Sequence, residues 1–144
     1  MKLYQTPVFD EAPLDELHDR VAEFKANGYT FVQICATLRE SSCELLYAFQ
    51  DTTYESGGLN GLMVDVPDGA AVPSITDLYP AAFVFENETH DLFGVNLEGI
   101  SIDFDGEFYT VAVAYPMNPR AAEAAAAAAE PAPAVAEGEE ADNE

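Results

Sequence analysis

Basic residues are scarce in this 144-residue sequence, which has 5 lysines and arginines against 27 acidic residues and a formal net charge of −22 at pH 7. Nucleic-acid binding depends on lysine and arginine side chains that replace the counterions of the phosphate backbone. Seven of the acids and one of the bases follow residue 118, so the preceding part of the chain is strongly acidic by itself. The composition therefore excludes nucleic acid as an expected partner and favours basic protein surfaces.

Long apolar runs are also absent, and the first residues lack the apolar stretch of a signal peptide. We therefore expect a cytoplasmic protein without a membrane span.

Cysteine is scarce too. Cys35 and Cys43 are the only two, and they lack the Cys-x-x-Cys spacing of redox and zinc motifs. Two thiols by themselves cannot ligate an iron–sulfur cluster. Both are expected to be buried, reduced thiols.

The local patterns that are present predict helices and strands in one domain. Apolar residues at three- and four-residue steps predict an amphipathic helix over residues 13–26, ended by Asn27-Gly28. Two β-branched and aromatic segments, 29–38 and 43–50, flank a polar turn and predict an antiparallel hairpin. A glycine-containing loop (51–60) and a third strand (61–67) follow. One face of the first hairpin strand is expected to carry Thr30, Val32, Ile34, Ala36 and Leu38.

The second half of the chain predicts a helix, two strands and a tail. Ser74 or Thr76 and Asp77 favour a helix entry, and the helix is expected from about Tyr79 or Pro80 to Leu92, with its stop at Gly94. Strands over 100–104 and 108–115 are expected around Asp105-Gly106, a two-residue turn signal. The alanine-, glutamate- and proline-rich residues 119–144 are expected to be a disordered acidic tail, apart from a transient helix in the alanine run.

The fold class predicted from these elements is α+β. We expect a two-layer sandwich in which two main helices pack on a mostly antiparallel sheet of about five strands. Residues 1–118 would form this domain, and residues 119–144 would lie outside it.

The densest polar cluster is Glu86-Asn87-Glu88-Thr89-His90-Asp91, in the last turns of the second helix. Glu86 and His90 are four residues apart and would share one face, while Glu88 and Asp91 would share another. A metal site usually needs three or four converging ligands, and only His18 could supply a second imidazole. Ion pairs or hydrogen bonds on an exposed helix surface are therefore favoured. The sequence also lacks a Gly-x-Ser-x-Gly elbow and a dinucleotide fingerprint.

Two stretches carry a resemblance to a known family, residues 72–82 (VPSITDLYPAA) and residues 85–95 (FENETHDLFGV). They resemble the signature of the C subunit of respiratory complex I and of its relatives in energy-converting NiFe hydrogenases. The resemblance extends over residues 12–98. Asn87 stands where the family usually carries arginine, which removes a five-donor fork for a partner carboxylate. His90 stands where complex I members often have tyrosine, and the short chain after Gly94 favours the hydrogenase branch.

The resemblance implies a non-catalytic structural subunit in the cytoplasmic arm of an energy-converting NiFe hydrogenase or complex I-like oxidoreductase. Such a subunit packs against the large catalytic NiFe-type subunit and the small iron–sulfur subunit. It would hold no cofactor, metal or catalytic residue, would have no small-molecule substrate, and would be peripheral to the cytoplasmic membrane through its complex. The expected partner-facing residues are Ser74, Asp77, Tyr79, Pro80, Glu86, Glu88, His90, Asp91, Phe93 and Gly94.

Two alternatives remain open at this point. One is a stand-alone metal-binding or hydrolytic protein that uses Glu86 and His90. The other is an acidic protein-binding module in which the tail from Ala121 to Glu144 acts as a polyanion.

Overall fold

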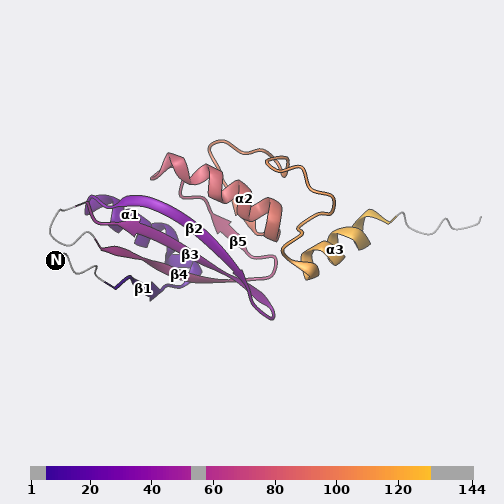
Figure 1. Ribbon diagram of the computed structural model, residues 1–144, viewed down its shortest axis with the longest axis horizontal. Coiled ribbons are helices and arrows are strands. Elements are labelled where there is room, and N and C mark those ends of the chain that lie inside the picture. Colours follow the sequence, from indigo (N-terminus) through magenta and orange to yellow (C-terminus); the bar gives the residue numbers. More distant parts are fainter. Residues whose placement is uncertain (1–5, 53–57, 131–144) are drawn as a thin grey trace, which may run out of the picture.

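The computed structural model describes residues 6–52 and 58–130 (Figure 1). Its architecture is α+β, as predicted, with a four-stranded mixed sheet and a small two-stranded one. The larger sheet has the order β1-β4-β3-β2, where β1 is Val8–Glu11, β2 is Thr30–Leu38, β3 is Ser42–Gln50 and β4 is Leu59–Pro67. Residues 53–57 of the predicted loop lie outside the described residues.

The predicted hairpin is confirmed, since β2 and β3 pair antiparallel, with Ile34 opposite Tyr47 and Leu38 opposite Cys43. β4 continues the antiparallel ladder, and β1, which was not predicted, adds to the other side of β4 in parallel. The expected face of β2 is only partly correct. The register shifts between Phe31 and Gln33, so Phe31, not Thr30 or Val32, lies on the same face as Ile34. Val32 is left 39% exposed.

Both main helices cover one face of this sheet. The first helix begins with a 3-10 turn, Leu14–Glu16, and continues as α1, Leu17–Ala26. The second begins with a 3-10 turn, Pro80–Ala82, and continues as α2, Phe83–Phe93, which ends where Gly94 adopts a left-handed φ of 70°. Phe49 stacks on Phe24 of the first helix and also contacts Tyr79 before the second, so one core joins the layers.

The predicted strands over 100–104 and 108–115 are wrong. The turn at Asp105-Gly106 does form, with φ values of 51° and 82° and a hydrogen bond from the Glu107 amide to the Phe104 carbonyl. The flanking residues do not pair, because their amides bond instead to polar side chains of α2. The second sheet consists of β5, Ala71–Pro73, paired in parallel with β6, Asn96–Glu98. We call residues 99–118 the strap, since they run along α2 without forming a helix or strand (Figure 1).

The tail from residue 119 was expected to be disordered apart from a transient helix in its alanine run, and its first part is helical in the structure. Pro119–Ala129 form helix α3, which lies at the opposite end of the molecule from α1 (Figure 1). The Asn118 side chain accepts a hydrogen bond from the Ala121 amide, and Pro119 occupies the first helical turn, so the helix has a well-formed start. Residues 131–144 of the predicted tail lie outside the described residues.

Two further expectations concern exposure and membranes. Cys43 is buried, as expected, but Cys35 is exposed, because alternate residues of β2 point away from the helices. Across residues 6–52 and 58–130, no helix has both the length and the apolar character needed to cross a bilayer.

Candidate functional site

The carboxyl group of Glu86 lies at the centre of a buried hydrogen-bond network. Glu86 is 0% exposed. Its Oε2 accepts from the Ser74 hydroxyl at 2.6 Å, and its Oε1 accepts from the Ile75 amide at 2.8 Å. Burial raises the pKa of Glu86, while these two hydrogen bonds act in the opposite direction. The helix entry and the helix are thereby joined by one side chain.

The network continues from the helix entry to the strap. Ser74 Oγ accepts from the Thr76 amide at 3.1 Å and lies 2.7 Å from the Thr76 hydroxyl. Thr76 Oγ1 in turn accepts from the Ser101 amide at 3.0 Å. Because Ser74 uses its one hydroxyl proton on Glu86, the Thr76 hydroxyl is the donor in the bond between the two side chains.

Asn87 holds the strap to α2 with both ends of its amide. Its Nδ2 donates to the carbonyl of Phe83 at 2.7 Å and to that of Ile102 at 2.9 Å. Its Oδ1 accepts from the amide of Phe104 at 3.0 Å. Asn87 itself is 1% exposed, and its three bonds are partly buried. An amide side chain supplies the donor and acceptor groups that this irregular backbone requires.

Asp91 holds the strap one helical turn later. Its Oδ2 accepts from the Tyr109 amide at 2.8 Å, and its Oδ1 lies 3.0 Å from Nδ1 of His90. The Tyr109 hydroxyl donates to Glu88 at 2.7 Å, and this bond to a carboxylate raises the pKa of Tyr109. Farther along, Asn118 donates to the Phe93 carbonyl at 2.8 Å. The strap is therefore attached at successive points along α2.

The ten predicted partner-facing residues fall into two groups. Ser74, Tyr79, Glu86 and Asp91 are buried within this chain, so the expectation that α2 exposes all its carboxylates is wrong for Glu86 and Asp91. The amphipathic pattern indicates which face is apolar, but it does not show that polar residues can face an irregular segment of the same chain. The other six are exposed or partly exposed: Asp77, Pro80, Glu88, His90, Phe93 and Gly94.

The two histidines do not come together as ligands. His18 Nε2 lies 2.8 Å from a carboxylate oxygen of Asp77, whereas His90 pairs with Asp91. Glu86 uses its carboxyl group on Ser74 and Ile75. Within the two described ranges, no group of three or more histidine, cysteine, aspartate and glutamate side chains is arranged to hold a metal ion.

Sequence reasoning missed the roles of Asn87, Thr76, Asn118 and Tyr109. Asn87 was noted only as the replacement of a family arginine, and Thr76 only as a possible helix cap. The available signal was the position of Asn87 in the middle of a helix, where asparagine is unfavourable unless its amide has partners. The identity of those partners, which lie 15 and 17 residues farther along the chain, depends on the tertiary structure.

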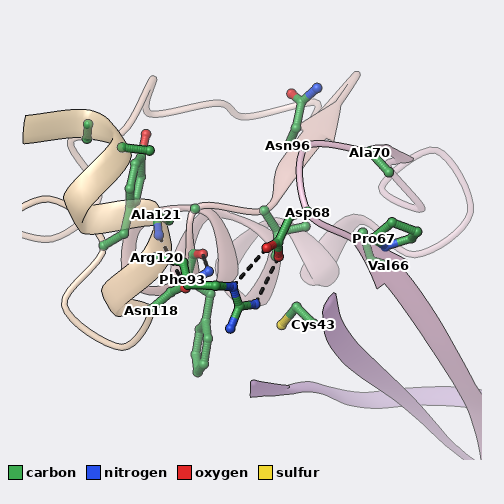
Figure 2. A pocket seen from close by; sticks show the side chains of 16 residues that line it. Cys43, Val66, Pro67, Asp68, Ala70, Phe93, Asn96, Asn118, Arg120 and Ala121 are labelled. Carbon is green, nitrogen blue, oxygen red and sulfur yellow. Dashed lines mark hydrogen bonds and ion pairs between the residues drawn. The ribbon is translucent and has the colours of Figure 1, made fainter. Parts of the chain in front are cut away.

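A hollow of about 400 Å³ separates α3 from the rest of the molecule (Figure 2). Its lining is mostly apolar and includes Phe93, Val95 and alanines of α3. Arg120 reaches across it and bonds to both carboxylate oxygens of Asp68 at 2.8 and 3.0 Å (Figure 2). Burial raises the pKa of Cys43, which also lines the hollow, so its thiol is less readily ionised than an ordinary cysteine.

The fold and the site together define a small α+β domain in which polar side chains of α2 bind the backbone of the strap. The family model described as "Respiratory-chain NADH dehydrogenase, 30 Kd subunit" matches residues 10–102. The chain therefore belongs to this family, and the resemblance to the C subunit of complex I is confirmed.

One solved structure extends the comparison beyond the family match. The chain is similar to a chain in the structure of the membrane-bound sulfane sulfur reductase (MBS), an archaeal respiratory membrane complex. The two chains are 26% identical with a TM-score of 0.67, and the similarity covers 82% of this chain and 72% of that one. Comparison with curated protein sequences gives no match.

Proposed function

We propose that this protein is a non-catalytic structural subunit in the cytoplasmic arm of a membrane-bound oxidoreductase, either an energy-converting NiFe hydrogenase or a complex I-like enzyme. It packs against the large catalytic subunit and the small iron–sulfur subunit. Membership of the 30 kDa subunit family supports the class of complex. Similarity to a chain of a membrane-bound respiratory complex named for sulfane sulfur reduction supports a branch outside the NADH-oxidising enzymes.

The observation that carries this proposal is the use of the family motif inside the chain. Glu86, Asn87 and Asp91 direct their polar atoms at backbone groups and side chains of this same chain. A catalytic acid or base must reach a substrate proton, and a metal ligand must leave a lone pair free for the ion. Side chains that are already bonded within a buried network serve instead to fix a shape, which is what an accessory subunit contributes.

The members of the predicted set that remain accessible form the proposed contact region on this side of the molecule. Asp77 has 61% of its side chain exposed, and His90 has 32%. Pro80 begins the 3-10 turn three residues after Asp77, and Glu88 lies on α2 together with His90. These residues would contact the large or small subunit, and attachment through those subunits would make the protein peripheral to the membrane.

Affinity purification from membranes of the source organism tests the proposal. A tagged full-length chain, solubilised in mild detergent, is expected to co-purify with a NiFe-type large subunit and an iron–sulfur small subunit, identified by mass spectrometry. Hydrogenase activity and nickel content measured on the purified complex distinguish the two branches. Recovery of the chain alone, in full yield, would contradict the proposal.

A further inference from the structure

The outer side of the strap is unusually apolar for a surface segment. Eight large hydrophobic side chains are exposed in the described part of the chain, and five of them belong to the strap. These five are Ile102 (52% exposed), Phe104 (41%), Tyr109 (39%), Val113 (61%) and Met117 (55%). Concentrated exposure of large apolar side chains is typical of a surface that another molecule covers.

The strap is also preformed. It has no helix or strand of its own, yet buried side chains hold its backbone at Ser101, Ile102, Phe104 and Tyr109. Phe104, Phe108 and Tyr109 pack edge to face, with ring centroids 5.1 and 5.0 Å apart. A segment fixed in this way loses little conformational entropy when a partner binds, which favours affinity.

The charge around these apolar side chains has one sign. Residues 41–119 contain no lysine or arginine. In the strap, Asp103, Asp105 and Glu107 are exposed between the apolar side chains, and Glu88 lies beside them, bonded to Tyr109. A surface on which acidic side chains stand between apolar ones is complementary to an apolar surface that carries lysine and arginine.

We infer that the strap surface, formed by Ile102, Phe104, Tyr109, Val113 and Met117 with Asp103, Asp105 and Glu107, docks onto a basic, apolar face of another protein. This inference rests on the proposed function, in which that protein is a subunit of the same complex. A second copy of this chain is disfavoured, because a symmetric contact would bring the acids of two straps together. An anionic membrane is disfavoured for the same electrostatic reason.

The first test replaces two apolar residues of the strap, Ile102 and Val113, whose side chains take no part in the hydrogen bonds that hold the strap. Ile102→Ser/Val113→Ser in the full chain is expected to reduce co-purified partner subunits by about tenfold or more, because truncating central apolar anchors of an interface typically has this effect. The matched control is Val8→Ser/Val32→Ser, which alters two side chains of similar exposure on the sheet. Both variants should keep the circular dichroism spectrum and melting temperature of the parent. Wild-type recovery of the complex with Ile102→Ser/Val113→Ser would overturn the inference.

The second test concerns charge and does not disturb the apolar side chains. Glu107→Lys is expected to weaken association, whereas Glu123→Lys, an equal change on exposed α3, is not.

Zero-length carbodiimide coupling on the intact complex should join Glu107 or Glu88 to a lysine of the partner. Complexes cross-linked only through the open face of the sheet would contradict the strap as the docking surface while leaving the proposed function intact. Recovery of the chain alone would contradict the proposed function itself. A dimer of the isolated chain that Ile102→Ser/Val113→Ser dissolves would assign the surface to a second copy and overturn the inference.

Discussion

At the scale of single residues, Glu86 is a carboxyl group whose buried surroundings solvate its charged form poorly. It is fully buried, and its raised pKa means that the folded protein holds its proton to higher pH than the unfolded chain does. At pH values between the ordinary pKa of 4.5 and the raised pKa of the folded state, folding is accompanied by proton uptake at Glu86. The stabilising contribution of Glu86 is therefore complete below pH 4.5 and is lost as the pH rises through the pKa of the folded state.

Glu86→Gln should reduce this loss. Glutamine has nearly the same shape and keeps an oxygen that accepts from the Ile75 amide, but it carries no charge at any pH. The free energy of unfolding of the variant, relative to the parent, should therefore increase as the pH rises from 4 to 8, which urea unfolding at several pH values can measure. Glu107→Gln, on the exposed strap, serves as the control. A difference between parent and Glu86→Gln that stays constant with pH would contradict the assignment.

Tyr47 presents a second buried polar group close to Glu86. Its hydroxyl has no hydrogen-bond partner in the described part of the chain, and burial together with the nearby Glu86 raises its pKa. Removing an unsatisfied buried hydroxyl is neutral or stabilising, because the ring packing remains while the desolvation penalty disappears. We expect Tyr47→Phe to raise the free energy of unfolding by up to about 1 kcal/mol, measured by urea denaturation. A loss of 1 kcal/mol or more would show that the hydroxyl has a partner.

At the scale of elements, α2 and the strap form one unit although they share no ladder or helix. Asn87 makes three bonds to the backbone, one within α2 and two to the strap. Asn87→Ala should lower the free energy of unfolding by about 1–3 kcal/mol, because it leaves partly buried backbone groups of Ile102 and Phe104 without these partners. It should also speed hydrogen exchange at Phe104 and proteolysis within the strap. Thr110→Ala, on the exposed part of the strap, should change neither property.

Arg120 plays the corresponding part for α3. Besides the two bonds to Asp68, it donates to the carbonyl of Arg39, in the turn after β2, and to that of Ser42, the first residue of β3. Helix α3 is rich in alanine and buries none of its side chains, so this one fork supplies much of its attachment. Arg120→Ala should speed hydrogen exchange across residues 119–129 while leaving the melting temperature of the domain nearly unchanged, because the ion pair is exposed. Arg120→Lys should give hydrogen-exchange rates between those of the parent and of Arg120→Ala, since lysine keeps the charge but cannot make the paired guanidinium bonds.

At the scale of the whole molecule, the acidic residues occur both in residues 6–130 and in residues 131–144. The proposed docking surface belongs to the strap, so the acidic residues after α3 are not needed for assembly. A chain ending at residue 130 should co-purify with the same subunits in the same yield as the full chain. Loss of the partners on this truncation would instead favour an acidic binding module that acts through residues 131–144.

Much of the fold was readable from local pattern. The spacing of Leu17 and Val21 identified α1, and alternation of Leu62, Val64 and Val66 identified β4, because a helix or strand that packs on one side repeats its apolar residues with its own period. The family motif was also readable, since it is a run of consecutive residues. The strap was not, because alternation around Asp105-Gly106 is equally compatible with a hairpin and with a segment bonded to side chains.

The sequence by itself determined the acidic charge, the two main helices, the central antiparallel strands and the family. These properties depend on composition or on neighbours within a few residues. Only the tertiary structure decided that Glu86 and Asp91 face inward, that Asn87 binds the strap, and that the apolar side chains of the strap remain outside. The partners of Glu86 at the helix entry, and those of Asn87 and Asp91 in the strap, lie between 11 and 18 residues away in the chain, and only the fold brings them within hydrogen-bond distance.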